Sequence, residues 1–584
     1  MATPIRKTKI VCTMGPNLFE KDLIADLMKA GMNVARFNFS HGDHESHKRN
    51  HDYVCRVRDE LGLPVATLLD TKGPEVRVKS FKEGRVTLQP GQLFTLTADE
   101  VDGDETRVSI TYKNLPQDVQ EGTSILIDDG LIGMVVEKIE GNDIICRVNN
   151  AGVVSNNKGV NIPNVHLSMP FISEKDRSDI IFAAKEGFDF IAASFTRSAD
   201  DILQMRQILK ENGGSHVNII AKIENMEGVE NIDEILRVVD GVMVARGDLG
   251  VEVPLEVVPS IQKELIQRCL AMGKPVITAT QMLDSMIEHP RPTRAEITDV
   301  ANAIYDGTSA IMLSGETAAG QYPVEAVQTM DAIARRTEAN IDRAKPLKVS
   351  GRERLSITAA MAHAACTTAV DIGADAILTV SQRGVTAQMV SRFRPQTPVV
   401  ALLLDAQVRR QMSLYWGVEA VMMPYARSTD ELVEFAVEAA EKAGIVKSGD
   451  LVVITAGVPV GIAGTTNMIR VQQVGGSLIN AIGIGSYKAS GRLCVCRTMD
   501  DVAEKFHEGD VLVMPYTTNA MLPYIRKAAA VITEETSAEC HTATIGLALD
   551  KPVIIGAVDA TRRLTDGTMV SVDCGRGVVQ TLPQ

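Results

Sequence analysis

The strongest constraint on the fold is a regular alternation of short apolar runs with amphipathic helical patterns. Eight runs are rich in Val, Ile and Ala, and each is followed by a helical pattern or, after the third, by a long gap. The runs cover residues 8–13, 32–37, 64–69, 188–194, 217–222, 241–246, 275–280 and 309–314. Strand–helix alternation implies a parallel sheet, and eight such units are the number that closes a TIM barrel. The sequence therefore predicts an α/β fold built on a (β/α)8 barrel.

The gap after the third predicted strand, about residues 73–170, has a different pattern. Its runs are short, alternate apolar with polar residues, and are broken by Gly, Asn, Asp and Pro without a convincing helix. We expect an all-β domain inserted there. Because the active-site loops of a TIM barrel lie at the ends of its strands, the insertion is placed to act as a lid.

Two further α/β regions follow the barrel, one from about residue 341 and one from about 476. No internal repeat, low-complexity stretch or structureless linker separates them. We therefore expect four domains: a barrel domain (1–72 and 171–340), the inserted β domain (73–170), an α/β domain (341–475) and an extra C-terminal domain (476–584).

Composition narrows the class of function. The net charge of −14 over 584 residues argues against general nucleic-acid binding, although local Lys and Arg can still form a pocket for a small anion. No apolar signal core and no run of 18 apolar residues is present, so we expect a cytoplasmic protein that contacts no membrane. Nine scattered cysteines fit reduced thiols better than a disulfide framework.

Polar residues gather where the predicted barrel strands end, which is where TIM barrels carry their chemistry. The set comprises Arg36, Asn38, Ser40, Asp70, Thr71, Lys72, Arg77, Lys222, Glu224, Asp248, Thr280, Ser314 and Glu316. An alternative is that these residues form salt bridges that only close the end of the barrel. Such surface ion pairs rarely involve so many polar residues in one place. The distribution favours an active site.

The stretch "NIIAKIEN" (218–225) is the most informative of these tips. Alternate residues of a strand point to one face, so the side chains of Lys222 and Glu224 should lie side by side. Burying these two charges costs desolvation energy unless a ligand interacts with both. Glu224 and Asp248 supply two hard oxygen ligands for Mg²⁺, and Lys222 supplies a point charge for a phosphoryl group or an enolate. Arg36 can clamp a phosphate or carboxylate.

The glycines of "RGDLG", Gly247 and Gly250, should let backbone N–H groups approach an anion. From the residues alone, we expect a Mg²⁺-dependent barrel enzyme acting on a small phosphorylated or carboxylated anion.

Seven motifs occur together in one order: "MNVARFNFSHG", "LLDTKGPEVR", "NNKGVNIP", "IIAKIEN", "VARGDLGVE", "ITATQMLDSM" and "LSGETAAGQYP". This ordered set closely resembles the pyruvate kinase family from the N-terminus to about residue 475. The resemblance implies a TIM barrel, an inserted β lid and a C-terminal α/β regulatory domain. It also implies phosphoryl transfer from phosphoenolpyruvate to ADP, giving pyruvate and ATP in glycolysis, by a homotetramer.

The resemblance assigns roles to the strand-tip residues. Lys222 stabilises the phosphoryl group in flight, Arg36 binds phosphoenolpyruvate, and Gly247, Asp248 and Thr280 lie beside the substrate. Glu224 and Asp248 hold Mg²⁺ (or Mn²⁺). The implied K⁺ ligands are Asn38, Ser40, Asp70 and Thr71, and the implied nucleotide-binding residues are Asn38, His41, Arg77, Lys158 and Ser314. A water relay near Thr280 is our hypothesis for proton delivery to the enolate.

Glu75, in "TKGPE", bears on the monovalent ion. In pyruvate kinases this position generally carries Glu in K⁺-dependent members and Lys in K⁺-independent ones. An anionic Glu near the phosphates needs a compensating cation, which a Lys would itself supply. The resemblance therefore implies that activity requires K⁺.

The stretch 379–395 predicts a strand, a polar turn and a helix start, which can gather hydroxyls, an Arg and backbone N–H groups around one phosphate. An ordinary strand–helix turn is the alternative. Because the stretch lies where the family's allosteric phosphate loop lies, we expect it to bind a phosphorylated effector. The expected residues are Ser381, Gln382, Arg383, Gly384 and Thr386.

The tail from about 476 resembles the swivelling phosphohistidine domain of phosphoenolpyruvate-utilising enzymes. His541 falls at the position of the phosphorylated histidine. The usual glycine-rich lead-in is replaced by "EETSAEC", and no ATP-grasp module accompanies it. A structural or regulatory tail is therefore preferred over a working phosphohistidine.

Two other functions compete with this interpretation. A Mg²⁺-dependent lyase or aldolase of the phosphoenolpyruvate/pyruvate-binding barrels would share the metal and the enolate, but the inserted domain and "LDTKGPE" count against it. A phosphocarrier or sensor with an inactive barrel would use the tail, but retention of Lys222, Glu224 and Asp248 counts against that.

Overall fold

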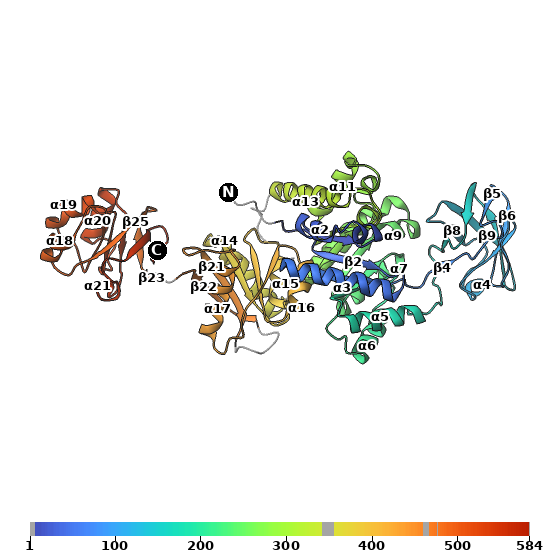
Figure 1. Cartoon of the computed structure of the whole chain (residues 1–584), viewed down its shortest axis with the longest axis horizontal. Coiled ribbons are helices and arrows are strands. Elements are labelled where there is room, and N and C mark those ends of the chain that lie inside the picture. Colours follow the sequence, from blue (N-terminus) through green and yellow to red (C-terminus); the bar gives the residue numbers. More distant parts are fainter. Residues whose placement is uncertain (1–5, 342–354, 459–465, 476, 583–584) are drawn as a thin grey trace. The chain divides into compact units, whose positions relative to one another are not determined.

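The computed structural model describes residues 6–341, 355–458, 466–475 and 477–582 (Figure 1). The chain forms two compact units. The first comprises Met1–Thr367, Thr379–Leu432 and Thr455–Met468, and the second comprises Thr368–Leu378, Val433–Ile454 and Ile469–Gln584. The predicted joins near 341 and 476 fall beside or on residues outside the described ranges.

Eight parallel strands close into a barrel, as the alternating pattern predicted. They are β1 (Lys9–Thr13), β2 (Val34–Asn38), β3 (Ala66–Asp70), β13 (Phe190–Ala193), β14 (Asn218–Ile223), β15 (Gly241–Ala245), β16 (Val276–Ala279) and β17 (Ala310–Leu313). Each strand is paired with its neighbour in sequence order, and β1 pairs with β17 to complete the ring. The predicted fold class is confirmed.

Helices connect the strands and cover the barrel. They are α1 (Pro16–Glu20), α2 (Ile24–Ala30), α3 (His44–Leu61), α5 (Glu174–Glu186), α6 (Ala199–Glu211), α7 (Met226–Glu230), α8 (Ile232–Val238), α9 (Arg246–Glu252), α10 (Val258–Met272), α11 (Arg294–Asp306), α12 (Gly315–Ala318) and α13 (Pro323–Asn340), with 3-10 turns η1 (Leu255–Val257) and η2 (Asp284–Ile287). Several begin at capping boxes, in which Ser173, Ser198 or Thr293 accepts a backbone N–H of the first turn.

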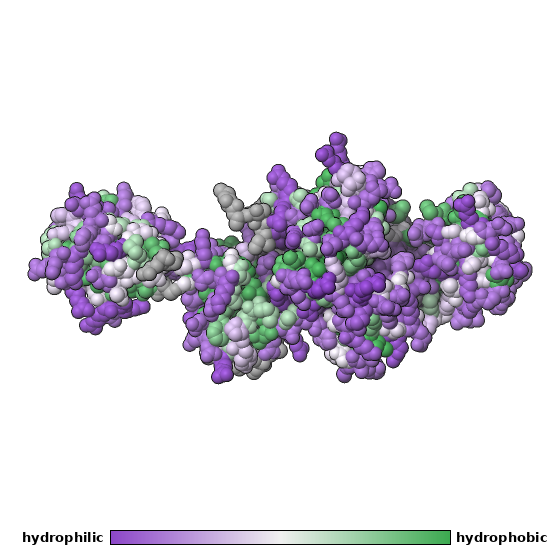
Figure 2. Space-filling view, in the orientation of Figure 1, coloured by the Kyte–Doolittle hydropathy of each residue, from purple (hydrophilic) through white to green (hydrophobic). Residues whose placement is uncertain are grey.

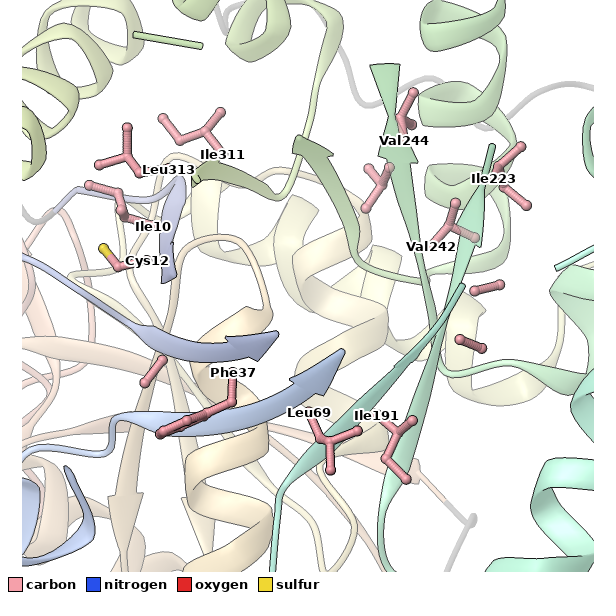
Figure 3. Packing of buried hydrophobic residues seen from close by; sticks show 14 of the residues in the cluster. Ile10, Cys12, Phe37, Leu69, Ile191, Ile223, Val242, Val244, Ile311 and Leu313 are labelled. Atoms are coloured by element: carbon pink, nitrogen blue, oxygen red, sulfur yellow. The ribbon is translucent and has the colours of Figure 1, made fainter. Parts of the chain in front are cut away.

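The alternation along each barrel strand produces two separate apolar layers. Side chains such as Ile10, Leu69, Ile191 and Ile311 point away from the barrel and pack with the surrounding helices (Figure 3). Their strand neighbours form a second cluster that fills the barrel. Because both faces of a parallel barrel strand are buried, the strands show nearly continuous apolar runs.

The inserted segment is a β domain, with strands β4 (Val76–Arg77), β5 (Arg85–Leu88), β6 (Leu93–Thr97), β7 (Arg107–Ser109), β8 (Ser124–Ile127), β9 (Ile132–Glu140), β10 (Asp143–Val148), β11 (Gly152–Ser155) and β12 (Gly159–Asn161). Seven of them form one sheet, and β11 pairs with β5 in a second. The expectation that this segment lacks helix is wrong in one place. A single turn, α4 (Leu115–Asp118), starts with a Pro in its first turn, where the missing N–H costs nothing.

After the barrel, a five-stranded sheet has the order β20-β19-β18-β21-β22. Its strands are β18 (Ala376–Val380), β19 (Val399–Leu403), β20 (Val418–Met422), β21 (Leu451–Gly457) and β22 (Thr466–Gln473). The helical elements are α14 (Ile357–Asp371), α15 (Val385–Arg392), α16 (Ala406–Gln411), η3 (Met412–Leu414) and α17 (Thr429–Lys442). The apolar runs "AILTVS", "PVVALLL" and "DLVVITAG" predict β18, β19 and β21, whereas β20 and β22 were not predicted.

The C-terminal segment forms an eight-stranded sheet of order β23-β30-β29-β25-β26-β27-β28-β24. Its strands are β23 (Ser477–Asn480), β24 (Ile482–Ile484), β25 (Lys488–Val495), β26 (Val511–Met514), β27 (Ala530–Thr533), β28 (Val553–Ile555), β29 (Met569–Asp573) and β30 (Val578–Thr581). Its helical elements are α18 (Met499–Lys505), η4 (Asn519–Met521), α19 (Leu522–Lys527), α20 (His541–Ala548) and α21 (Ala560–Arg563).

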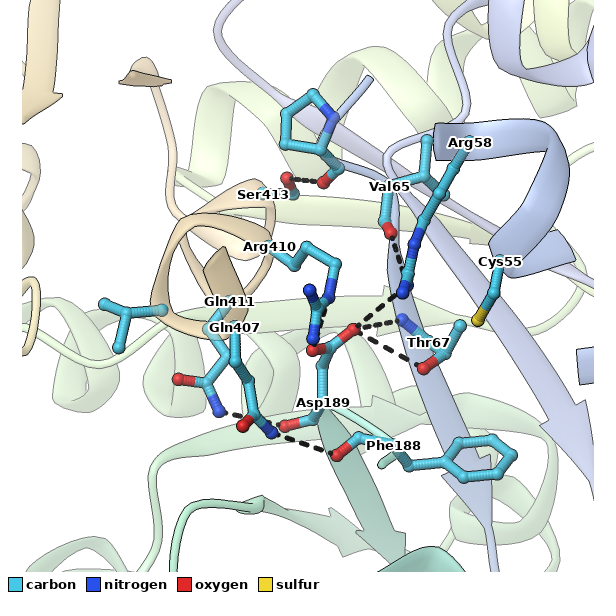
Figure 4. A network of polar contacts seen from close by, with 12 residues as sticks. Cys55, Arg58, Val65, Thr67, Phe188, Asp189, Gln407, Arg410, Gln411 and Ser413 are labelled. Carbon is cyan, nitrogen blue, oxygen red and sulfur yellow. Dashed lines mark hydrogen bonds and ion pairs between the residues drawn. The ribbon is translucent and has the colours of Figure 1, made fainter. Parts of the chain in front are cut away.

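The α16–η3 segment packs against the starts of the barrel strands, opposite the strand tips. Asp189, which has no exposed surface, accepts hydrogen bonds from Thr67 N and Arg410 Nε at 2.9 Å each (Figure 4). Leu414 joins the apolar cluster inside the barrel. The buried charge of Asp189 is thus shared with Arg410, which ties this segment to β3 and β13.

No helix in the described part of the chain is both long and apolar enough to span a bilayer. The face shown in Figure 2 carries mostly hydrophilic residues, with hydrophobic ones in scattered areas.

A buried histidine makes the stability of the barrel sensitive to acid. His51 of α3 is 3% exposed and stacks on Phe188 with ring centroids 4.2 Å apart. Burial, helped by the nearby Arg58, lowers the pKa of His51 to about 4. In the unfolded chain His51 is protonated below about pH 6.5, whereas in the folded chain it is protonated only below about pH 4. This histidine therefore contributes stability above pH 6.5 that is lost as the pH falls towards 4.

We expect the His51→Gln variant to be less acid-sensitive than the wild type. The difference in free energy of unfolding between them should change by up to roughly 3 kcal/mol between pH 7 and pH 4, because each pKa unit is worth about 1.4 kcal/mol. Chemical denaturation across this pH range measures it. His289→Gln, at an exposed position, is the matched control. A pH-independent difference for His51→Gln would contradict the assignment.

Candidate active site

The Lys222 ammonium lies at the tip of β14 with three oxygen partners. Its Nζ is 2.9 Å from Glu224 Oε1 and 3.1 Å from Asp70 Oδ1, and it donates to Ser194 Oγ at 2.8 Å. The side chain of Lys222 is 11% exposed, and those of Asp70 and Glu224 are 1% exposed. The pairing of Lys222 with Glu224, expected from alternation, is thus present, and Asp70 joins it.

Burial and charge act against each other in this cluster. Burial favours the neutral amine of Lys222, but the carboxylates of Asp70 and Glu224 outweigh it and raise its pKa. Burial raises the pKa of Glu224, and the like charge of Asp248 adds to this against the opposing effect of Lys222. Lys222 therefore remains an ammonium, and a further cation beside Glu224 would stabilise the ionised form of that carboxyl.

Arg36, at the tip of β2, is held from two sides. Its Nε is 2.6 Å from Asp70 Oδ2, and its Nη1 donates to Thr13 Oγ1 at 2.8 Å. Burial would raise the pKa of Asp70, but Arg36 and then Lys222 outweigh it, so that this pKa is lowered. Asp70 therefore stays ionised between the two cations and fixes both of them at one end of the barrel.

The tip of β16 presents Thr280 in a strained conformation, with φ +67°. Its Oγ1 accepts a hydrogen bond from Gly247 N at 2.8 Å. The expectation for Gly250 is wrong: "RGDLG" forms the start of α9, and Gly250 is the fifth residue of that helix, where the N–H bonds within the helix. Asp248 lies in the first turn of α9.

The four residues predicted to hold a monovalent ion lie on the adjoining tips of β2 and β3, which pair in register from Val34↔Ala66 to Asn38↔Asp70. Asn38 Oδ1 accepts from Ser40 N at 3.1 Å, and Thr71 Oγ1 donates to Ala192 O at 3.2 Å. Together with Asp70 they supply neutral oxygens and one carboxylate. This donor set suits a monovalent ion better than a divalent one.

A cavity of about 550 Å³ lies between the inserted β domain and the barrel. Arg77 and Lys158 line it from the inserted domain, and Asp248 lines it from the barrel. Arg77 Nη2 is 2.7 Å from Glu75 Oε2, and Lys158 Nζ is 2.8 Å from Asp128 Oδ1. Both predicted nucleotide-binding cations therefore already have carboxylate partners on the same wall.

Negative charge accumulates on both walls of this cavity. Burial, and then the like charges of Asp248 and Asp128, raise the pKa of Asp129. Asp128, Asp129 and Gly130 are three successive residues with positive φ, which turns this loop sharply. A cation bound together with an anionic ligand would relieve the repulsion between the carboxylates.

Three predicted nucleotide-binding residues, Asn38, His41 and Ser314, lie outside the residues that line this cavity. His41 is exposed after β2, and its carbonyl accepts from His47 Nε2 at 2.7 Å. Ser314, at the tip of β17, has a buried Oγ without a hydrogen-bond partner among the described residues. The buried Glu316 accepts from Ser314 N at 2.7 Å and from Leu283 N at 3.0 Å, which holds the loops after β16 and β17 together.

Sequence reasoning missed two residues that contact this site. Ser194, 1% exposed, follows β13 directly, and its Oγ lies 2.8 Å from Lys222 Nζ. Phe195, with φ +55°, donates its backbone N–H to Glu224 Oε2. The strand that ends at Ser194 was predicted, so its tip could have been included with the other polar tips. The contact of a Phe backbone N–H leaves no sequence signal.

The expected effector residues lie at the end of β18 and the start of α15. Gly384 has φ +74° and caps α15, and a Cβ there would come within 2.5 Å of Met412 Cε. Thr386 Oγ1 is 2.7 Å from Thr466 Oγ1. Arg383 is exposed beside them. The predicted strand–turn–helix arrangement is therefore present.

In the C-terminal segment, His541 is the first residue of α20. Its Nδ1 lies 2.8 Å from Thr517 Oγ1, and its Nε2 lies 3.0 Å from Asn519 Oδ1. Thr517 in turn contacts Thr542, whose hydroxyl donates to Glu535 Oε2 at 2.8 Å. Both ring nitrogens are thus engaged by neighbours of the same segment.

Within the described residues, no group of three or more His, Cys, Asp or Glu side chains is arranged to hold a metal ion. A divalent ion at Glu224 and Asp248 would have two protein carboxylates, with its other ligands from water and substrate. That is how Mg²⁺ is usually bound beside phosphorylated substrates. The donor chemistry therefore fits Mg²⁺, and the like charges of Glu224 and Asp248 favour a cation between them.

Three family models match successive parts of the chain. They are described as "Pyruvate kinase, barrel domain" (residues 5–327), "Pyruvate kinase, alpha/beta domain" (359–472) and "PEP-utilising enzyme, mobile domain" (506–577). The third match agrees with the resemblance seen in the tail.

Relatives of known name cover nearly the whole length. The pyruvate kinase of Geobacillus stearothermophilus is 50% identical over 577 residues, covering 98% of each chain. That of Bacillus licheniformis is 49% identical over 578 residues, covering 98% of this chain and 99% of the relative. A solved structure of a pyruvate kinase from Cryptosporidium parvum aligns with a TM-score of 0.76 at 38% identity, covering 80% of this chain and 96% of the other. The chain belongs to the pyruvate kinase family.

Proposed function

We propose that the chain transfers the phosphoryl group of phosphoenolpyruvate to ADP, forming pyruvate and ATP as a step of glycolysis in the cytoplasm. The observation that carries this proposal is the buried Lys222 ammonium held between Asp70 and Glu224, beside Arg36. Phosphoryl transfer needs little covalent help, only alignment and compensation of charge. The test is ADP-dependent pyruvate formation, measured with and without Mg²⁺ and K⁺. C–C cleavage without ATP formation would instead support a lyase.

Each residue at the barrel tips has a proposed task. Arg36 binds phosphoenolpyruvate, and Lys222 compensates the charge of the group in transfer. Gly247, Asp248 and Thr280 border the substrate. The strained loop at Thr280 orients its hydroxyl, and a water relay there delivers the proton to the enolate carbon.

Glu224 and Asp248 would hold Mg²⁺ (or Mn²⁺), which supplies Lewis-acid stabilisation of phosphoryl oxygens. Asn38, Ser40, Asp70 and Thr71 would hold K⁺. Both assignments are supported by hard oxygen donors on adjoining strand tips.

The nucleotide is proposed to lie in the cavity between the inserted β domain and the barrel. Arg77 and Lys158 reach its phosphates from the inserted domain, and Asn38, His41 and Ser314 contact it from the barrel. Arg77 would then leave Glu75, and Lys158 would leave Asp128, so that both side chains can bind phosphate oxygens of the nucleotide. The inserted domain would then act as a lid that excludes water.

We also propose the four domains given by the sequence, with boundaries after residues 72, 170, 340 and 475, assembled as a homotetramer. For His541 we propose a structural or regulatory role, since both of its ring nitrogens have partners within the segment.

The loop of Ser381, Gln382, Arg383, Gly384 and Thr386 is proposed to bind the phosphate of an allosteric effector. The helix start at Gly384 supplies backbone N–H groups, and Arg383 supplies an exposed cation.

We expect Arg383→Ala to weaken activation by a phosphorylated metabolite without lowering the maximal rate at saturating phosphoenolpyruvate. A charge-assisted contact of about 1.5–3 kcal/mol corresponds to a roughly 10- to 150-fold higher activating concentration. Titrations with AMP, ribose 5-phosphate and fructose 1,6-bisphosphate measure this. Arg427→Ala, at another exposed arginine of the same domain, is the control. Unchanged activation in Arg383→Ala would make the loop an ordinary strand–helix turn.

A further inference from the structure

Ser194 lies between the Lys222 ammonium and the tip of β3. Its Oγ accepts a hydrogen bond from Lys222 Nζ at 2.8 Å, and lies 2.7 Å from Thr71 O and 3.1 Å from Asp70 Oδ1. The residue is 1% exposed. One small hydroxyl therefore contacts the ammonium and two of the residues proposed to hold K⁺, Asp70 and Thr71.

The surrounding backbone fixes this hydroxyl in place. Ser194 N donates to Thr71 Oγ1 at 3.2 Å, so backbone and side chain both bind the tip of β3. On the other side, a Cβ added at Gly73 would come within 2.8 Å of Ser194 Cβ. The next residue, Phe195, turns with positive φ and donates its N–H to Glu224. Ser194 therefore contacts Lys222, and the next residue, Phe195, contacts Glu224.

Ser194 differs from the other two hydrogen-bond partners of Lys222 because it carries no charge. An ammonium has three N–H donors, and Asp70, Glu224 and Ser194 provide three acceptors. Asp70 and Glu224 are also the carboxylates proposed to bind cations, which compete for the same lone pairs. Ser194 is the neutral acceptor of the three, and it can keep its hydrogen bond to Lys222 while the carboxylates hold their ions.

The hydroxyl has a single proton to donate, and the shorter of its two acceptor distances is to Thr71 O. Its lone pairs remain directed to Lys222. A shift of Thr71 or Asp70 on binding a monovalent ion would therefore move Ser194 Oγ, the atom that accepts the hydrogen bond from Lys222 and orients its ammonium.

We propose that Ser194 is a positioning residue: its hydroxyl aims the Lys222 ammonium at the transferring phosphoryl group and links that aim to occupancy of the monovalent-cation site. This inference rests on the proposed function. It predicts that loss of the hydroxyl lowers turnover more than substrate binding, because Lys222 acts mainly in the transition state.

The experiment compares Ser194→Ala, Ser194→Cys and Ser194→Thr by kcat, by KM for phosphoenolpyruvate and by the half-saturating K⁺ concentration. Loss of one hydrogen bond to a charged group should lower kcat about ten- to hundred-fold in Ser194→Ala. KM should stay within about threefold, and the half-saturating K⁺ concentration should rise. Cysteine fills the same space but accepts hydrogen bonds weakly, so it should behave like alanine. Threonine keeps the hydroxyl and should recover most of the rate.

Thr196→Val is the matched control. Thr196 is buried two residues further along, and its hydroxyl donates to Ala193 O at 2.9 Å, with no charged partner among the described contacts. It should keep kcat and the response to K⁺. Melting temperatures of all variants distinguish a loss of stability from a loss of the correct orientation of Lys222.

A kcat within about threefold of wild type in both Ser194→Ala and Ser194→Cys would overturn the inference, as would an equal loss in Thr196→Val. Failure of the proposed function would appear in the wild-type chain, as absence of ADP-dependent pyruvate formation, and would remove this inference with it.

Discussion

Lys222→Met is expected to abolish turnover while phosphoenolpyruvate and Mg²⁺ still bind. The ammonium compensates charge that develops in the transition state, so its removal should lower kcat by roughly 10³-fold or more and leave ground-state binding largely intact. Met has a similar length and no charge. Asp70 keeps its ion pair with Arg36, and Glu224 keeps the hydrogen bond from Phe195, so the carboxylates are not left without partners.

Lys9→Met provides a matched control for this change. Lys9 is 4% exposed at the start of β1, where its Nζ donates to Val418 O at 2.8 Å. It is therefore a buried lysine at the end of the barrel opposite the strand tips. Its loss should cost stability, measured by melting temperature, but should keep kcat. Calorimetric titration with phosphoenolpyruvate tests binding in Lys222→Met. A kcat reduced less than about tenfold in that variant would exclude the proposed role.

Activity is expected to require K⁺, with Na⁺ or Li⁺ as poor substitutes, and Glu75→Lys should relieve much of this requirement. Glu75 pairs with Arg77 at 2.7 Å and lines the cavity proposed for the nucleotide. A lysine there would free Arg77 and add a cation beside the phosphates. Because about 1.4 kcal/mol of charge compensation is a factor of ten, the K⁺-free rate should rise at least roughly tenfold.

Pyruvate formation in buffers containing a bulky organic cation, with each alkali ion added in turn, measures the requirement. Glu83→Lys is the control, since it makes the same charge change at an exposed position of the inserted β domain. It should remain as dependent on K⁺ as the wild type. Full activity of the unmodified chain without K⁺ would show that the oxygens of Asn38, Ser40, Asp70 and Thr71 do not serve a required ion.

Much of the fold was predictable because its signals are local. The barrel strands and the break for the inserted domain follow from apolar periodicity, and the predicted strands match the observed ones to within a few residues. The strand β22 was missed because its burial alternates irregularly, and β20 was missed although Val418 to Val421 alternate between buried and half-buried positions. The helix at "RGDLG" was missed because two glycines in five residues favour a loop, and the contacts of the barrel tip overrode that propensity.

The sequence by itself determined which charges meet. Parallel strands in a closed barrel end at one face, so Lys222, Glu224 and Asp70 had to come together once the strands were identified. Only the tertiary structure decided how they pair. Ser194 and Asp70 are 124 positions apart, and their contact depends on the stagger of β3 against β13 and on the left-handed turn at Phe195. The same holds for Asp189 and Arg410, which are 221 positions apart and meet where α16 packs on the barrel. Local patterns set the direction of a side chain along its own strand, whereas its distance to a partner is set by the packing of the whole barrel.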